Sequence, residues 1–478
     1  MEWSYIIHIG IISLALLGGA VVRARVKFLQ RFLLPVSIIA GIFLFIFYNF
    51  IAPRLGFTGD FLGELVYHLL NISFISMMLR VNNDKQPKGA KRGILGQNIT
   101  AIIAQYGLQS FFGLMITAIL MATVMPNLFP AIGYTLVLGF ELGPGQAYSI
   151  GSIWEGMGFV GGASVGLTMA AIGFFVGSFG GIVLINQGIK RGWIGKKYLE
   201  NLEKKSVRTG FFSRIESERP VGSYLSTDGE SIDTFSYHIA LVMFVYLLSW
   251  AILTLLSKLL YLIGPLGQEL ADSLWGINFV FSAFCALAVK KFMQLVKVDT
   301  TVDNGTCNRI NGVAVDLTVA ASLGAINLVV VRGYWLPILL LTLAGLFIVL
   351  VLIPFYTSRL YSDHQFQRML IIYGTATGTL PTGLALLRVV DPEFDTPVAT
   401  DYLYSVGVVF VLAIPILLSA NLPAFSVTQN KPHLFWVTVA ISAVYIIGSL
   451  IAYKILAKKR AFAKMGQLFY TEELDGKV

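Results

Sequence analysis

Residues 133–151 read GYTLVLGFELGPGQAYSIG and lie between two long apolar runs. Gly139, Gly143 and Gly145 interrupt any helix that this stretch forms, and Pro144 adds to the effect because proline removes a backbone donor. Inside a bilayer the freed backbone groups need partners other than water, so broken backbone occurs only within protein or beside a water-filled cavity. The stretch therefore predicts a re-entrant loop rather than an ordinary membrane span.

A second interrupted stretch, YGTATGTLPTG at residues 373–383, follows in the C-terminal half of the chain. The spacing from Gly139 to Gly143 recurs there as the spacing from Gly374 to Gly378. Two interrupted apolar segments at corresponding positions of two halves are the best indication in a sequence of a transporter's binding site. The pattern therefore indicates a secondary transporter.

The composition is typical of an integral membrane protein, with 56% hydrophobic residues, 13% charged residues and a mean hydropathy of +0.75. The net charge of +9 does not indicate nucleic-acid binding, because the Lys and Arg form short clusters between apolar runs. Cys285 and Cys307 lack metal-like spacing, and the histidines are scattered. We therefore expect no enzyme activity, no nucleic-acid partner and no cofactor besides a coupling ion.

Apolar windows of about 20 residues predict an all-α membrane protein with two inverted five-helix repeats, each with a re-entrant loop, and one extra C-terminal helix. The N-terminal repeat, 1–189, has predicted spans near 4–22, 32–52, 61–80, 94–123 and 162–188. A basic linker, 190–234, is predicted to be cytoplasmic. The C-terminal repeat, 235–427, has predicted spans near 235–263, 275–297, 308–331, 335–357 and 401–427, with its loop near 366–390. Residues 428–478 add a span near 434–456 and a tail from Ala461 that we expect to be frayed or helical.

The basic residues predict the orientation. An N-terminus on the outside places most Lys and Arg in cytoplasmic loops or tails and leaves the C-terminus in the cytoplasm. The exceptions are Arg54, Lys258, Arg332 and Lys431. The loop at 133–151 then enters from the outside and the loop at 366–390 from the cytoplasm, so we expect their tips to meet near the midplane.

Polar groups of the two loops are candidates to bind a small anionic solute. The helix that begins after the second break offers free backbone amides and a positive dipole end, which suit a carboxylate. Glu141 is predicted to bind a coupling cation, to carry a proton or to contact a substrate amine. The predicted substrate-binding residues are Gly139, Glu141, Gly143, Gly145, Gln146, Thr375, Thr377, Gly378, Thr379 and Thr382. The alternative is that Glu141 and the threonines only satisfy the broken backbone.

Asp316 lies near the middle of an otherwise apolar predicted span, which makes it a candidate to bind sodium or a proton. Sodium is a hard cation that prefers oxygen ligands, and the corresponding span of the first half also carries polar side chains. The predicted sodium ligands are Asp316, Thr318, Ser322, Asn71 and Ser73. The alternative for Asp316 is a role in helix pairing.

Three polar residues of the fourth span, Asn98, Gln105 and Gln109, are predicted either to line the same cavity or to form interhelical hydrogen bonds. Arg388 follows the second loop, at its predicted cytoplasmic mouth. We expect it to act in surface electrostatics or gating.

The two glycine-rich loops, each between the fourth and fifth helices of a repeat, resemble the bacterial sodium/glutamate symporter family. The resemblance is most specific at 139–151, at 171–186, and at 374–383 followed by 406–421, and 311–328 is similar to the family's eighth helix. It implies sodium-driven glutamate uptake across the bacterial inner membrane, by a core that carries both loops against the scaffold of a homodimer. Glu141 and Asp316 depart from the family's pattern, which suggests a distant member.

The sequence therefore predicts a sodium-coupled symporter for glutamate or a related small carboxylate, surrounded by membrane lipid. Proton coupling through Glu141 or Asp316 is the alternative within transport. A channel, or a sensor that signals through the linker, is the alternative outside transport, although the linker is too short to hold an effector domain.

Overall fold

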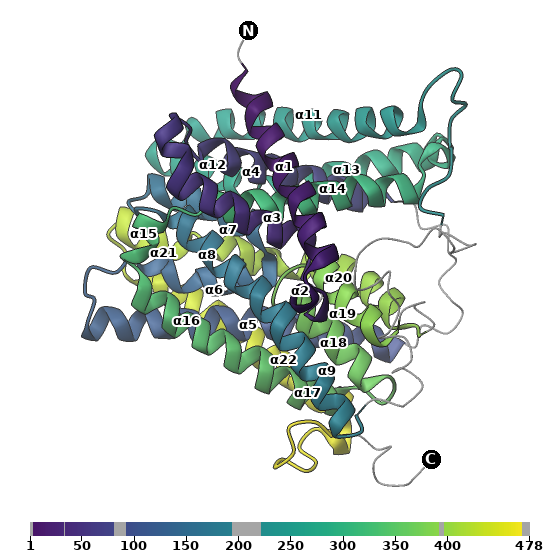
Figure 1. Cartoon of the computed structure of the whole chain (residues 1–478). Coiled ribbons are helices and arrows are strands. Elements are labelled where there is room, and N and C mark those ends of the chain that lie inside the picture. The colour runs from purple at the N-terminus through teal and green to yellow at the C-terminus, as the bar shows by residue number, and fades with distance from the viewer. Residues whose placement is uncertain (1–2, 33, 81–91, 194–220, 392–395, 471–478) are drawn as a thin grey trace.

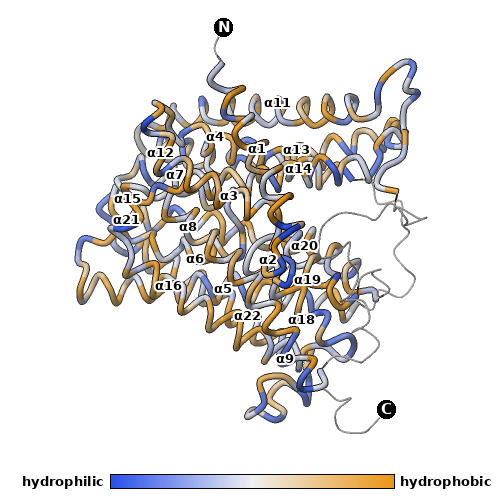
Figure 2. Tube along the Cα trace, in the orientation of Figure 1, coloured by the Kyte–Doolittle hydropathy of each residue, from blue (hydrophilic) through white to orange (hydrophobic). Residues whose placement is uncertain are grey.

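The computed structural model describes residues 3–32, 34–80, 92–193, 221–391 and 396–470. All regular secondary structure in these ranges is helical. Nine helical stretches among them are long and apolar enough to cross a membrane, and each coincides with a predicted span. They are Ser4–Arg25, Val36–Leu55, Asp60–Leu79, Gly93–Thr123, Gly162–Lys190, Thr234–Tyr261, Trp335–Leu360, Val398–Thr428 and His433–Arg460. The chain therefore folds as an all-α, multi-pass membrane protein, and Figure 2 shows that its hydrophilic residues gather mainly at the loops between helices.

Two of the eleven predicted spans differ from the structure. The span predicted at 275–297 is a pair, Leu270–Gly276 and Asn278–Leu295, bent by 69°. The span predicted at 308–331 divides into α14 (Asn304–Gly324) and α15 (Leu328–Arg332), because the side chain of Asn327 accepts hydrogen bonds from the first turn of α15. Helix α14 is not counted among the helices that are apolar enough to cross a membrane, since it carries polar residues along much of its length.

The helices form two groups that pack side by side. Figure 1 shows the first group across the top of the view and α5, α16 and α22 across the bottom, with α6–α8 and α18–α20 between them. The first group contains α1 (Ser4–Arg25), α3 (Val36–Ile46), α4 (Asp60–Leu79), α11 (Thr234–Tyr261), α12 (Pro265–Gly276), α13 (Asn278–Leu295) and α14. The second contains α5 (Arg92–Thr123), α6 (Thr135–Val137), α7 (Pro144–Gly156), α8 (Gly162–Phe175), α9 (Gly181–Lys190), α16 (Trp335–Phe347), α17 (Ile353–Leu360), α18 (Gln365–Thr375), α19 (Leu380–Val390), α20 (Val398–Ser419), α21 (Leu422–Thr428) and α22 (His433–Ala457).

The packing within each group is extensive. In the first group α4 packs along α14, while α3 lies against α14 and α13 lies against α4. In the second group α22 packs along α5, which also contacts α16 and α20. Asp303 caps the N-terminus of α14, because its carboxylate accepts a hydrogen bond from the Thr306 backbone. Burial alone would raise the pKa of Asp303, but the hydrogen bonds from Thr306 and from the backbone of Tyr224 and Gly305 together outweigh it and lower that pKa.

The C-terminal tail is neither frayed nor helical as far as residue 470, so that expectation is wrong. Phe469 is only 3% exposed, and its ring stacks on Trp193 with 4.8 Å between the ring centroids. The buried guanidinium of Arg359 donates hydrogen bonds to backbone carbonyls of the tail, those of Ala463, Lys464 and Gln467. These contacts hold the tail against the ends of α9 and α17. Most of the predicted linker, 194–220, lies outside the described residues.

Candidate functional site

The first broken helix pair occupies the predicted loop at 133–151. A continuous helical stretch, Pro130–Leu142, ends at Gly143, and α7 begins at Pro144. Gly143 has a φ of +94° and a ψ of −178°, a conformation that is essentially restricted to glycine. No side chain caps α7 at this point. The amides of its first turn are therefore without helical partners and can bind an anion.

The second broken helix pair consists of α18 and α19. Thr379 precedes α19 in an extended conformation, with a φ of −144°, and its side chain does not cap the helix. Thr375, at the end of α18, accepts a hydrogen bond of 2.8 Å from the hydroxyl of Tyr402 on α20. The second pair therefore also presents an uncapped helix N-terminus next to hydroxyl groups.

The two breaks touch each other. A Cβ atom placed on Gly143 would lie 3.1 Å from the Thr379 Cγ2 atom and 3.3 Å from the Gly378 carbonyl oxygen. The helix of the first pair approaches α8 closely, since a Cβ on Gly139 would lie 2.6 Å from the backbone nitrogen of Ala170. The two breaks are thus in contact, and we name this contact the crossing; that they are the tips of re-entrant loops at the membrane midplane stays a prediction.

A cavity of about 470 Å³ lies beside the crossing, between α4 and α14 of the first group and the broken pairs, α5 and α20 of the second. Its wall includes Glu141, Gln146, Thr375, Thr379, Ser73 and Thr318. Buried residues such as Leu70, Phe279 and Leu417 close it on one side. Exposed Asn308 and Arg388 line it on the other side, so the cavity opens where α14 begins and α19 ends.

Two arginines lie in the wall near the mouth of the cavity. Arg80 follows the last turn of α4, and Arg388 belongs to the last turn of α19. That Arg388 lies at the cytoplasmic mouth of the second loop stays a prediction. Positive charge along a cleft raises the local concentration of anions.

Glu141 lies in the cavity wall, and its Oε2 atom is buried without a hydrogen-bond partner among the described residues. The backbone hydrogen bonds that a purely structural role requires are therefore missing at this oxygen. The phenols of Tyr106, Tyr356 and Tyr402 interact with Glu141 electrostatically. Because a carboxylate within a membrane is costly without a companion, this oxygen is placed to receive a proton or a cation.

Only part of the predicted substrate-binding set faces the cavity. Thr375 and Thr379 line it, whereas Thr377 and Thr382 do not contribute to the wall. Thr377 is fully buried and donates its hydroxyl to the Tyr373 carbonyl, so it satisfies the broken backbone as the alternative proposed. Among the predicted glycines, Gly143 and Gly378 are at the crossing, Gly145 is in the wall, and Gly139 provides close packing.

The structure does not bring the five predicted sodium ligands together. Ser73 and Thr318 line the cavity, and the Thr318 hydroxyl is buried without a partner among the described residues. Asn71 is fully buried and accepts a hydrogen bond from Ser282 on α13. Two of the five predicted ligands therefore face the cavity.

The two remaining predicted ligands also belong to α14 and are not part of the cavity wall. Ser322 donates its hydroxyl to the Val319 carbonyl, and Asp316 lies beside Ser37 of α3, outside the cavity wall. Within the described ranges no group of three or more His, Cys, Asp and Glu residues is placed to hold a metal ion. A cation site in this region would therefore need neutral oxygen ligands.

Several cavity residues were not predicted from the sequence. Asn308, Asn311 and Val315 recur at helical spacing with the predicted Thr318 along one face of α14, and all four line the cavity. This spacing in the sequence could have indicated a polar face of α14 that lines a cavity. Arg80 and Tyr402 also line the wall, but nothing in their local sequence distinguishes them from other residues at helix ends.

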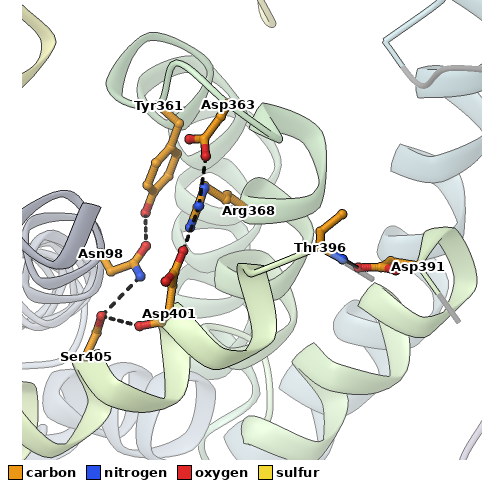
Figure 3. A network of polar contacts seen from close by, with 8 residues as sticks. All are labelled: Asn98, Tyr361, Asp363, Arg368, Asp391, Thr396, Asp401 and Ser405. Carbon is orange, nitrogen blue, oxygen red and sulfur yellow. Dashed lines mark hydrogen bonds and ion pairs between the residues drawn. The ribbon is translucent and has the colours of Figure 1, made fainter. Parts of the chain in front are cut away.

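A network of charges fixes the base of the second broken pair (Figure 3). Arg368 of α18 is 1% exposed, and its Nη2 atom lies 3.2 Å from Asp363 and 2.8 Å from Asp401 of α20. The backbone carbonyl of Asp401 accepts a hydrogen bond from the Ser405 hydroxyl. That hydroxyl in turn accepts a hydrogen bond from the side-chain amide of Asn98 on α5. The base of the second pair is thus attached to both α20 and α5.

Comparisons of the chain with protein-family models, with curated proteins and with solved structures find no match. The class that fold and composition establish is an all-α, multi-pass membrane protein.

Proposed function

We propose that the protein is a secondary active transporter that couples sodium to the symport of a small carboxylate, with glutamate as the first candidate. The observation that carries the proposal is the crossing, where two broken helix pairs meet tip to tip beside a cavity of about 470 Å³. Discontinuous helices that meet at a cavity are typical of substrate sites in transporters. The uncapped N-termini of α7 and α19 and the two arginines suit an anionic group.

The inverted repeat and the orientation belong to the same proposal. The matched packing of α3 on α14 and of α13 on α4 is what a two-fold relation between the halves predicts. With the N-terminus outside, the broken pairs are re-entrant loops from opposite sides of a bacterial inner membrane. With this orientation the cavity mouth at Arg388 would face the cytoplasm, as expected of an inward-open state in the proposed cycle.

Alternating access follows from the position of the cavity between the two helix groups. The first group would act as the scaffold of a homodimer. The second group, which carries both breaks, would move as a unit and expose the crossing to one side and then to the other. The two breaks keep their mutual contact in this scheme, because they belong to the same group and move together.

Uptake into proteoliposomes tests this proposal. Purified protein should take up radiolabelled glutamate under an inward sodium gradient and not under a matched potassium gradient. The substitution Arg388→Gln should raise the glutamate concentration needed for half-maximal uptake, because it removes positive charge at the mouth. If no small carboxylate enters under any ion gradient, the transport proposal is wrong.

Proton coupling is the second candidate, and the position of Glu141 favours it. Glu141 is in the cavity wall with an unpartnered oxygen, whereas Asp316 lies outside the wall. In sodium-free proteoliposomes an inward proton gradient should then drive uptake, and Glu141→Gln should abolish that uptake. Uptake that needs sodium at every pH gradient would exclude this candidate.

A further inference from the structure

We propose that Glu141, Gln105 and Gln109 hold a monovalent cation, Na⁺ as the first candidate, between α5 and the crossing. The proposal rests on cation coupling in the proposed function and gives the coupling ion a set of ligands. Each of the three side chains has one buried oxygen without a hydrogen-bond partner among the described residues. We name the three residues the α5 site.

The orientation of the Gln109 amide is fixed by its neighbour. Gln109 is 0% exposed, and its Nε2 atom donates a 3.2 Å hydrogen bond to the carbonyl of Ala376, at the end of α18. A carbonyl can only accept, so the nitrogen must be on that side and the oxygen must point away from it. The unpartnered Oε1 of Gln109 is therefore a true acceptor without a donor.

The same reasoning fixes Gln105. Gln105 is also 0% exposed, and its Nε2 atom donates a 2.7 Å hydrogen bond to the Tyr356 hydroxyl. That hydroxyl uses its own proton for a 3.0 Å hydrogen bond to the Ala101 carbonyl, so it can only accept from Gln105. The Oε1 atom of Gln105 is thus a second buried acceptor without a donor.

Helix α5 brings these residues to the region of Glu141, since Gln109 contacts the end of α18 beside the crossing. Gln105 and Gln109 are one turn apart on α5, and Tyr106 of the same helix lines the cavity together with Glu141. Tyr356, which binds Gln105, interacts electrostatically with Glu141. The unpartnered oxygens of Gln105 and Gln109 on α5 and of Glu141 therefore belong to segments that meet beside the crossing.

A missing ligand explains these oxygens better than poor packing does. Buried polar groups in native proteins are nearly always hydrogen-bonded, and a group of unsatisfied acceptors at one place indicates an ion or a donor that completes them. One carboxylate and two neutral amides balance a single positive charge. Ca²⁺ and Mg²⁺ need more oxygen ligands or bound water, so a monovalent ion fits the set.

The broken helices add to the preference for a cation. The stretch Pro130–Leu142 and α18 both end at the crossing, and the C-terminal end of a helix carries partial negative charge and free carbonyls. The uncapped N-termini of α7 and α19 begin at the same place and suit an anion. A cation at the α5 site would hold Gln109 and Ala376 in place, and so order the break at which the anion binds.

Equilibrium binding of ²²Na⁺ to the purified full-length protein, without any solute, tests the α5 site directly. Glu141→Gln should abolish saturable binding, and Gln105→Leu and Gln109→Leu should each weaken it by roughly tenfold or more, which corresponds to about 1.4 kcal/mol or more. Thermal unfolding in sodium-free buffer checks that each variant folds. The matched control is Gln97→Leu. Gln97 is on the same helix and also has an unpartnered oxygen, but its amide donates to the Leu360 carbonyl at the end of α17, and about three helical turns separate it from Gln109.

The outcomes separate this inference from the proposed function. Sodium binding that depends on all three residues but not on Gln97 supports the α5 site, even if no carboxylate is transported. Sodium-driven uptake with binding unaltered in folded Gln105→Leu and Gln109→Leu overturns the α5 site and leaves the proposed function in place. Absence of saturable ²²Na⁺ binding to the unsubstituted protein, or binding lost in Asp316→Asn and retained in Glu141→Gln, also overturns it.

Discussion

The two broken helix pairs meet at one point but are built differently. The first pair is held by close backbone packing, as at Gly139 against Ala170, and it carries the acid Glu141 near its tip. The second pair has hydroxyl groups near its tip, and charges fix its base, where Arg368 binds Asp363 and Asp401. At the crossing, the first pair therefore contributes a tip that carries an acid and belongs to a tightly packed helix. The second pair contributes a neutral tip, and ion pairs fix its base.

This difference suggests a division of roles. A charged tip needs a rigid support, because any shift would leave the carboxylate in an apolar environment without its companion. A neutral tip can tolerate small movements, provided that its base stays attached to the helices that move with it. The first pair would bind the coupling ion, and the second would respond to that ion through the Gln109 contact with Ala376.

Removing the charge at the base of the second pair should have the largest effect. Arg368→Ala leaves two carboxylates without their partner, and we expect the free energy of unfolding to fall by about 3 kcal/mol. Thermal unfolding in detergent measures the change. The control is Asp363→Asn, which should cost less than about 1 kcal/mol because Asp363 is partly exposed. Equal stability of Arg368→Ala and the unsubstituted protein would contradict the role of this network.

A change at the two breaks should have a smaller effect that differs between the pairs. Gly143→Ala places a side chain on a backbone with a φ of +94°, and we expect a loss of about 1–3 kcal/mol. Thr379→Ala changes a residue with an extended backbone and should be nearly neutral in stability. Denaturant or thermal unfolding of both variants tests the contrast. Similar losses of stability at the two positions would show that the positive φ of Gly143 does not require a glycine.

The smallest effect is expected at Tyr402. Tyr402→Phe removes the hydrogen bond to Thr375 and leaves the ring in place, so we expect a loss of about 1 kcal/mol in stability. Uptake in proteoliposomes should persist, because Thr375 keeps its own hydrogen bonds to backbone carbonyls. A complete loss of uptake in the folded variant would place Tyr402 in the transport step instead.

The positions of the breaks could be predicted because glycine and proline act locally. Gly143 and Pro144 end one helix and begin another in any surroundings, and the same holds near Thr379 and Pro381. The attachment of Arg368 to Asp401 could not be predicted, since it depends on how α18 packs against α20. The positions of glycine and proline in the sequence thus predict where the helices break, whereas the contacts around the breaks depend on tertiary packing.

The helical spacing of the predicted sodium ligands could have shown that they do not all face one cavity. Asp316 and Thr318 are two residues apart, which places their side chains about 200° apart around a helix, so both could not face one cavity. Asn311 and Thr318 share a face, and both line the wall. Gln105 and Gln109 were recognised as polar residues in a span, but only their contacts with Tyr356 and Ala376 reveal which oxygen remains free.

The central claim is that the crossing is reached from both sides of the membrane in turn. Thr379→Cys, with Cys285 and Cys307 replaced by Ser, would be labelled in oriented vesicles with a membrane-impermeant thiol reagent. The control, Val160→Cys, lies in an exposed loop between α7 and α8 and is 71% exposed. The account predicts that Thr379→Cys reacts from the cytoplasmic side without sodium and changes sides when sodium and glutamate are added, while Val160→Cys always reacts from the outside. Reaction of Thr379→Cys from one side only, unaffected by ions and solute, would contradict alternating access at the crossing.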